Sequence, residues 1–78
     1  MVDPQVAAAA LTLPPNPLTP REIEVLRLSA EGSAARQIAA ELFISTATVR
    51  NYLSTIVAKL NARTQLDAVR IATDAGWI

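Results

Sequence analysis

The apolar period of residues 46–60 constrains the fold of this 78-residue chain more than any other feature. Apolar side chains recur there at i, i+4, i+7, i+8 and i+11, which places them on one face of an α-helix. Ser45 precedes the pattern as a favoured N-cap, and Asn61 follows it where a left-handed residue can stop the helix. We therefore predict a helix here with one buried face. That face consists of Val49, Leu53, Ile56, Val57 and Leu60.

Residues 18–22 give the clearest helix start in the chain. Thr19 is a suitable N-cap, and Pro20 fits the first helical position, where no backbone N–H is needed. Glu22 stands three residues after the cap, so its side chain can complete a capping box. We expect this helix to run until Gly32 ends it. The inward positions at helical spacing are Ile23, Leu26 and Ala30.

Residues 34–42 also show helical spacing. Two alanines stand at the start of this segment, so we expect either that Ser33 caps the helix one residue early or that the first turn frays. A short apolar turn at residues 43–44 then leads into the helix of residues 46–60. The inward positions are Ile38, Ala39 and Leu42.

The last helix is predicted to open at Thr64, because Asp67 stands three residues later, where it supports an N-cap. Gly76 stops this helix before an apolar tail of Trp77 and Ile78. The inward positions are Leu66, Ala68, Val69, Ala72 and Ala75. Four helices without a strand pattern predict an all-α fold.

Residues 1–17 contain four of the five prolines and no sustained apolar period. We interpret this segment as an extended, largely disordered N-terminal arm or linker. The ordered domain is then residues 18–78. The predicted fold class is a four-helix helix-turn-helix domain with a disordered N-terminal arm.

Composition argues against catalysis. The chain has no cysteine and no histidine, so it lacks thiolate metal ligands and the commonest general base. Its carboxylates and Tyr52 show no spacing that acid–base chemistry requires, and we expect no enzyme activity, no metal and no cofactor. No segment approaches the roughly 18 apolar residues of a membrane span, so we expect neither a signal peptide nor a membrane partner.

The charges balance at seven basic and seven acidic residues, but they are unevenly distributed. Residues 1–43 hold three basic and five acidic side chains, whereas residues 44–78 hold four basic and two acidic ones. The second half is therefore mildly positive without forming a basic patch. This charge distribution is compatible with a nucleic-acid partner, but it does not by itself indicate one.

The helices of residues 34–42 and 46–60, joined by a short turn, have the form of a helix-turn-helix. The outward face of the second helix is small and polar, and no carboxylate occurs between residues 42 and 66. A helix can enter the major groove, about 12 Å wide and lined by phosphates, only if its exposed face has this character. Arg50 can donate two hydrogen bonds to guanine, and Asn51 can pair with adenine. The outward positions are Ala47, Arg50, Asn51, Ser54 and Ala58.

Each of these residues also has an ordinary structural interpretation. An arginine and an asparagine are common on any solvated helix face, and Ser54 can be a neutral surface residue. The hydroxyls of Thr46 and Thr48, with the free N–H groups of the helix start, can hold a phosphate, but Thr48 can equally be a capping hydroxyl.

Several spaced blocks in this chain resemble the C-terminal DNA-binding domain of LuxR/NarL-type transcription regulators. The resemblance covers residues 18–78. Within the family, the combination of Thr-Val-Arg-Asn-Tyr with a Gly-Trp-Ile ending makes this chain most similar to response regulators of the desaturase type. The blocks are Leu18-Thr-Pro-Arg-Glu-Ile-Glu-Val-Leu26, Ile38-Ala39, Thr48-Val-Arg-Asn-Tyr-Leu-Ser54 and Lys59-Leu60.

This resemblance implies a cytoplasmic, dimeric domain that follows a receiver domain through a linker and binds double-stranded promoter DNA. It places the base contacts at Arg50, Asn51 and Ser54. It also implies that the last helix forms a homodimer, although simple core packing is an equal alternative for Leu66 and Val69. The predicted dimerisation residues are Leu66, Val69, Arg70 and Thr73.

Three further cations are candidate phosphate contacts: Arg36, Lys59 and Arg63. Lys59 and Arg63 can instead complement the negative end of the preceding helix, and Arg36 can pair with a nearby carboxylate. The family often has a basic residue where this chain has Gln65, and a lysine-rich recognition helix where it has Ser54 and Ala58. Fewer cations mean fewer phosphate contacts, so we expect a shallow salt dependence of DNA binding and a strong reliance on dimerisation.

Two other functions remain open on the sequence. A promoter-reading domain of a sigma factor shares a similar first helix and scanning helix, but such domains usually lack the helix of residues 64–78. A helical protein-interaction module that does not bind DNA would be compatible with the zero net charge.

Overall fold

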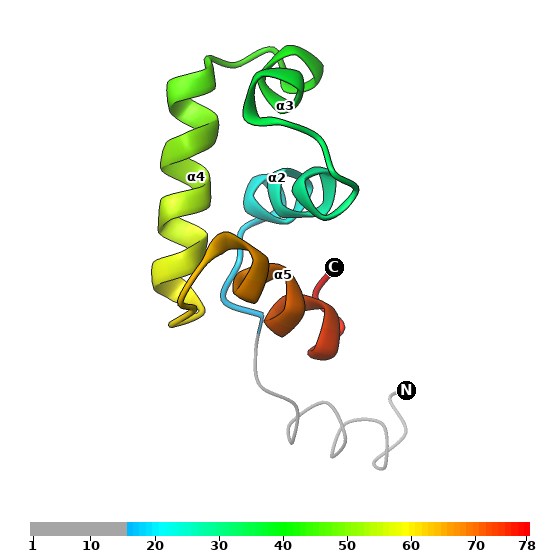
Figure 1. Ribbon diagram of the computed structural model, residues 1–78, viewed down its shortest axis with the longest axis vertical. Coiled ribbons are helices and arrows are strands. Elements are labelled where there is room, and N and C mark those ends of the chain that lie inside the picture. The colour runs from blue at the N-terminus through cyan, green and yellow to red at the C-terminus, as the bar shows by residue number, and fades with distance from the viewer. Residues whose placement is uncertain (1–15) are drawn as a thin grey trace, which may run out of the picture.

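A computed structural model describes residues 16–78, which form four helices and contain no strand (Figure 1). The predicted all-α fold with four helices is therefore confirmed. The expectation of a disordered arm falls mainly on residues 1–15, which lie outside the described residues. None of the helices in the described part is long and apolar enough to cross a membrane. The helices are α2 (Pro20–Ala30), α3 (Ala35–Leu42), α4 (Thr46–Lys59) and α5 (Gln65–Asp74).

The longest helix, α4, runs along one side of the molecule, and the other three helices lie beside it (Figure 1). α3 lies near the N-terminal end of α4, α2 lies near its middle, and α5 lies near its C-terminal end. α2 is central, because it packs against α3, α4 and α5. This arrangement leaves one long face of α4 uncovered within residues 16–78.

The core lies between α4 and the helices beside it. α5 contributes the small side chains of Ala68 and Ala72, both fully buried, which lets its backbone approach the core closely. Three predicted inward residues are wrong, since Ala30, Leu66 and Ala75 are exposed near the ends of their helices. Val25 was not predicted and is fully buried, because α2 packs against helices on more than one side. The largest fully buried side chains are Leu26, Ile38, Ile56, Val25 and Val49.

Hydroxyl caps begin three of the four helices, as predicted. The Thr19 hydroxyl accepts from the Glu22 N–H at 3.2 Å, and the Glu22 carboxylate accepts from the Thr19 N–H at 2.7 Å, which completes the capping box. The Ser45 hydroxyl accepts from the Thr48 N–H at 3.0 Å. At α5 the N-cap is Thr64.

Of the two alternatives for the start of α3, a cap by Ser33 is wrong. The N-cap residue is Ala34, in an extended conformation at φ −72° and ψ 157°, and its side chain has no acceptor atom. Only the reverse bond forms, in which the Ala34 N–H donates to the Gln37 side chain at 2.9 Å. Ser33 is instead part of the turn that ends α2, where its N–H donates to the Leu28 carbonyl.

Left-handed residues separate the helices. Gly32, Asn61 and Gly76 have positive φ angles, as the sequence predicted, and glycine adopts this conformation without steric cost. Phe43 was not predicted to do so, yet its φ is 57° and the residue is 94% exposed. A bulky residue in this conformation costs about 1–2 kcal/mol. The turn between α3 and α4 is therefore set by the packing of the two helices.

Replacing Ala34 by serine should stabilise the domain, because serine supplies the acceptor that α3 lacks. A side-chain N-cap contributes about 1 kcal/mol, and in a domain of this size that raises Tm by about 4–8 °C. Thermal unfolding followed by circular dichroism measures the change. Ala40→Ser, at an exposed position inside α3, is the control and should lower Tm slightly. An unchanged Tm in A34S would contradict the assigned cap position.

Candidate nucleic-acid interface

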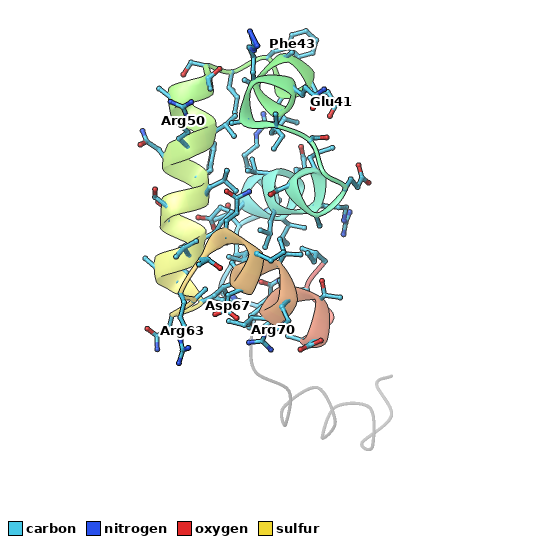
Figure 2. All side chains as sticks on the ribbon, in the orientation of Figure 1. Glu41, Phe43, Arg50, Arg63, Asp67 and Arg70 are labelled. Atoms are coloured by element: carbon cyan, nitrogen blue, oxygen red, sulfur yellow. The ribbon has the colours of Figure 1, made fainter. Side chains whose placement is uncertain are left out.

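The uncovered face of α4 carries the residues that the sequence singled out for reading bases. Arg50, Asn51 and Ser54 are exposed, while Val49, Leu53 and Ile56 on the opposite face are buried. Figure 2 shows Arg50 toward the N-terminal end of α4 and Arg63 beyond its C-terminal end. The small outward residues Ala47 and Ala58 are exposed as well.

Two shallow hollows border this face on different sides. Arg50 and Ser54 line a hollow of about 480 Å³ that α4 shares with Thr64 and Gln65 at the start of α5. Asn51 lines another, of about 250 Å³, on the side of α2. Its other lining residues are Glu22, Thr48, Tyr52 and Thr55. The candidate base-reading side chains therefore extend to both edges of the exposed face.

The N-terminal end of α4 is uncompensated by acidic side chains. Its first turn contains no aspartate or glutamate, so the positive end of the helix dipole is available to an anion. The Thr48 hydroxyl lies 2.8 Å from that of Ser45, in the cap itself. The capping interpretation of Thr48 thus has a contact to support it. Thr46 is half-buried at the first helical position.

Several arginines have no ion-pair partner among residues 16–78: Arg27, Arg36, Arg50 and Arg63. The carboxylate partner considered for Arg36 is thus not found in the described part of the chain. The remaining cations, Arg21, Lys59 and Arg70, all pair with carboxylates. The cations without partners include three of the predicted DNA-binding residues.

Lys59 is held differently from the other predicted phosphate contacts. Its ammonium lies 2.7 Å from the Glu22 carboxylate and donates to the Pro17 carbonyl at 3.3 Å. Sequence reasoning missed this pair, because Glu22 and Lys59 are 37 residues apart and the capping box already explained Glu22. A phosphate contact by Lys59 stays a prediction.

Glu22 is the buried charged residue of the described region, at 4% exposure. Burial acts to raise its pKa, but hydrogen bonds from Lys59 and from Thr19 outweigh burial and hold the pKa below the ordinary 4.5. The pKa of Asp67 also lies below its ordinary 3.8, because the Arg63 N–H and the Arg70 guanidinium donate to it.

The predicted dimerisation residues lie on α5. Leu66 is 79% exposed, so the core-packing alternative is wrong for it, whereas Val69 is half-buried against the core. Both line a hollow of about 310 Å³ together with Ser29, Ala30 and Gln65. Thr73 is exposed.

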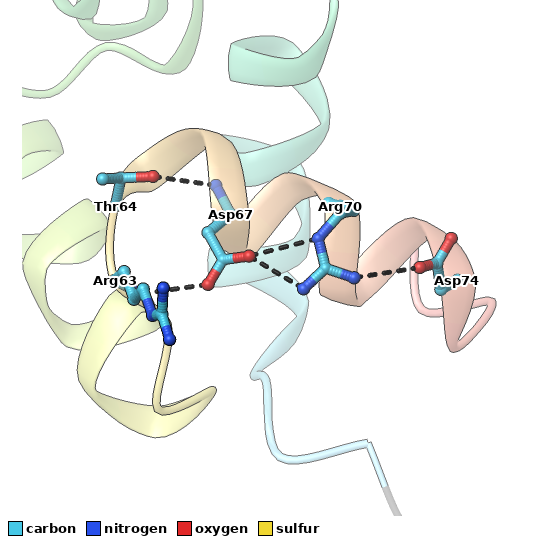
Figure 3. A network of polar contacts seen from close by, with 5 residues as sticks. All are labelled: Arg63, Thr64, Asp67, Arg70 and Asp74. Atoms are coloured by element: carbon cyan, nitrogen blue, oxygen red, sulfur yellow. Dashed lines mark hydrogen bonds and ion pairs between the residues drawn. The ribbon is translucent and has the colours of Figure 1, made fainter.

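Arg70, the fourth predicted dimerisation residue, is fixed on the surface of α5 by two carboxylates (Figure 3). It donates to Asp67 at 2.8 Å and to Asp74 at 3.3 Å. Asp67 also accepts from the backbone N–H of Arg63 at 3.0 Å. The turn between α4 and α5 is therefore tied to the first turns of α5.

Residues 16–72 match the family described as "Bacterial regulatory proteins, luxR family". The chain belongs to this family. Membership confirms the predicted resemblance and makes this luxR-family chain a DNA-binding helix-turn-helix domain of transcription regulators. Structural similarity agrees, since the transcription factor GerE superimposes with a TM-score of 0.76 at 31% identity, over 80% of this chain and 92% of that chain.

Relatives of the luxR-family domain are longer proteins. The uncharacterized transcriptional regulatory protein YvfU of Bacillus subtilis is 52% identical over 81% of this chain and 32% of its own length. The response regulator RamR of Streptomyces coelicolor is 45% identical over 97% of this chain and 38% of its own length. The chain thus spans about a third of these relatives. The transcriptional regulatory protein DesR of Bacillus subtilis is 47% identical, which is close to the identities of YvfU and RamR. These similar identities do not single out one type of response regulator, so the placement in the desaturase type stays a prediction.

The luxR-family domain should lose stability in acid below pH of about 4.5. A carboxyl whose folded pKa is depressed contributes stability that is complete above its unfolded pKa and is lost as the pH falls through the folded pKa. Glu22, with an ordinary pKa of 4.5, and Asp67, with 3.8, both act in this direction. Tm should be nearly constant from neutral pH to about pH 5 and then fall.

The variant Glu22→Gln isolates the buried carboxyl, because the amide oxygen can still accept from the Thr19 N–H. Its Tm should be lower than that of the wild type at neutral pH, and the difference should shrink as the pH is lowered. Glu24→Gln removes the same charge from an exposed position and is the control. A Tm difference that stays constant through acid would show that the carboxylate of Glu22 does not stabilise the fold.

Proposed function

We propose that this domain binds double-stranded promoter DNA sequence-specifically in the cytoplasm, with α4 in the major groove, as the output domain of a two-component response regulator. The observation that carries the proposal is the exposed face of α4. That face presents Arg50, Asn51 and Ser54 on a helix that carries no carboxylate of its own, in a domain of a DNA-binding family.

The size and polarity of the α4 face support insertion into a groove. Alanines at positions 47 and 58 leave room for the groove walls, and the polar residues between them can reach base edges. Arg50 can donate two hydrogen bonds to O6 and N7 of guanine, and Asn51 can pair with N6 and N7 of adenine. Ser54 can donate to or accept from a base farther along the helix.

Phosphate contacts would flank these base contacts. The uncompensated N-terminal end of α4, with Thr46 and Thr48, is suited to one phosphate. Arg36, in the first turn of α3, and Arg63, in the turn after α4, have no ion-pair partners among the described residues and can approach others. Such contacts position the protein on the duplex without reading its sequence.

The relatives support a larger protein with a receiver domain N-terminal to this one. RamR is a response regulator, and the solved response regulator ChrA, from a heme-sensing two-component system, matches 99% of this chain but only 40% of its own length, with a TM-score of 0.76 and 38% identity. A receiver domain would account for much of the remaining length.

A homodimer through α5 would place two copies of α4 on successive half-sites. Leu66 is an exposed apolar side chain beside the hollow on α5, and a second copy would remove it from water. Arg70 and Thr73 would form the polar edge of this contact. Dimerisation also offsets the few phosphate contacts of each copy, because two linked binding events increase the overall affinity.

Arg50→Ala tests the base-reading face on a duplex selected from random sequence. We expect affinity for the selected duplex to fall about 5- to 150-fold, as for the loss of a bidentate base contact, with a smaller loss on random duplex. Arg27→Ala is the matched control. It removes the same charge from an exposed arginine of α2 that has no ion pair within residues 16–78, and affinity should change less than about twofold.

Fluorescence-anisotropy titrations measure the affinities of these variants for the two duplexes. Repeated for the wild type across salt concentrations, they also measure the number of phosphate contacts. We expect the slope of log K against log salt to be no steeper than about −5. A much steeper slope would contradict the small set of phosphate contacts. If the wild type binds no duplex at micromolar dimer concentration, the proposed function is wrong and the protein-interaction module is favoured.

Leu66→Asp tests the dimer. Leu66 is 79% exposed, so the variant should fold, but a charge should be excluded from an apolar interface. Binding to a duplex with two half-sites should weaken at least about tenfold, while binding to a single half-site should not change. Ala40→Asp adds the same charge at an exposed position of α3. Equal losses on both duplexes in L66D would argue against dimerisation through α5.

A further inference from the structure

A single ammonium group connects the start of the described chain to the end of α4. Lys59 Nζ donates to the Pro17 carbonyl at 3.3 Å and to the Glu22 carboxylate at 2.7 Å. The same carboxylate accepts from the Thr19 N–H at 2.7 Å. Leu18, between these groups in the sequence, is buried at 6% exposure. The segment leading into α2 and the last turn of α4 are therefore fastened to each other.

This ion pair differs from the others in the described residues. The Arg21–Glu24, Arg70–Asp67 and Arg70–Asp74 pairs each lie within one helix, and their arginines are 43% and 64% exposed. The Lys59–Glu22 pair joins α4 to α2, and its carboxylate is buried at 5% side-chain exposure. A buried carboxylate left without its cation is costly, so this contact strongly favours one relative position of the two helices.

The pair supplies a directional restraint that apolar packing lacks. Val49, Leu53 and Ile56 keep one face of α4 against the core, but apolar contact is non-directional and tolerates small rotations of a helix about its axis. A rotation of α4 larger than the flexible stem of Lys59 can follow would displace its Nζ from both acceptors. The same rotation would re-aim Arg50 and Asn51, which lie about two turns earlier on the same rigid helix.

We propose that Lys59 is a positioning residue for DNA reading, whose ammonium fixes the rotation of α4 through Glu22 and the Pro17 carbonyl instead of contacting a phosphate. This inference rests on the proposed function. It assigns the specificity of Arg50 and Asn51 partly to a residue that does not touch a base.

Lys59→Met tests the proposal, because methionine keeps the apolar stem and removes the ammonium. Arg21→Gln is the matched control, since it breaks an ion pair and makes the same change in net charge. The ratio of affinities for the selected and random duplexes should fall at least about fivefold in K59M and stay unchanged in R21Q. The salt slope on random duplex should be equal in the two variants.

Other combinations overturn the proposal. A salt slope lowered by about 0.9 in K59M relative to R21Q would identify a phosphate contact, whether or not the ratio changed. If K59M keeps both the ratio of affinities and the salt slope, the Lys59–Glu22 ion pair contributes to stability but not to DNA reading.

A double variant, Glu22→Gln with Lys59→Met, keeps the experiment informative if K59M does not fold. It removes the ion pair without leaving a buried charge, and the amide oxygen of the introduced glutamine can still accept from the Thr19 N–H. We expect the same fall in the affinity ratio, and amide shifts in the DNA-free ¹⁵N spectrum that extend from Lys59 to Arg50. The matched double variant of Arg21→Gln with Glu24→Gln should leave the α4 amides in place.

The DNA-free spectra separate this inference from the proposed function. If the wild-type protein does not prefer its selected duplex over random duplex, the proposed function is wrong. The role of Lys59 in DNA reading is then wrong too, even if the α4 amides shift in the double variant. If the wild type clearly prefers its selected duplex, and the double variant keeps both this preference and the wild-type α4 amide shifts, only the positioning role of Lys59 is wrong.

Discussion

The packing of α4 against α2 and α3 is the contact on which the rest of the structure depends. Three residues of α4 are buried in the core, two of them completely, and this burial determines which residues of the helix remain exposed. α2 stands at the centre and contacts each of the other helices, so its fully buried Val25 and Leu26 support the whole bundle. A domain this small has no second core, and the exposed face of α4 is therefore a direct consequence of one cluster of apolar side chains.

The parts of the fold that sequence could predict are those set by neighbouring residues. The starts of α2, α4 and α5 follow from hydroxyls that bond to an N–H three residues later, and Gly32, Asn61 and Gly76 stop helices by their own conformational preferences. What sequence could not predict depends on the tertiary arrangement. The left-handed Phe43 follows from the packing of whole helices, and the same packing leaves Leu66 exposed, a choice between core and surface that the sequence had left open. In the candidate site, the helical period identified Arg50, Asn51 and Ser54 as exposed, but nothing local indicated the partner of Lys59.

The pairing of charges explains how a neutral chain can present a positive surface. Arg21, Lys59 and Arg70 are engaged by carboxylates of the domain itself, which removes acidic and basic groups together. Among residues 16–78, four arginines and only two side-chain carboxylates, those of Glu31 and Glu41, are left without ion-pair partners, and Arg50 is the unpaired arginine on the exposed face of α4. Net charge alone is a poor guide here, because the field near a surface depends on which charges are left uncompensated.

The proposed function requires that the outer face of α4 meet the base edges of the major groove. Intermolecular nuclear Overhauser effects between the labelled protein and its selected duplex test this most directly. We predict contacts from the side chains of Arg50 and Asn51 to major-groove protons such as cytosine H5 and purine H8. Contacts from these side chains to minor-groove protons alone, or contacts to DNA only from α2 and α3, would contradict it.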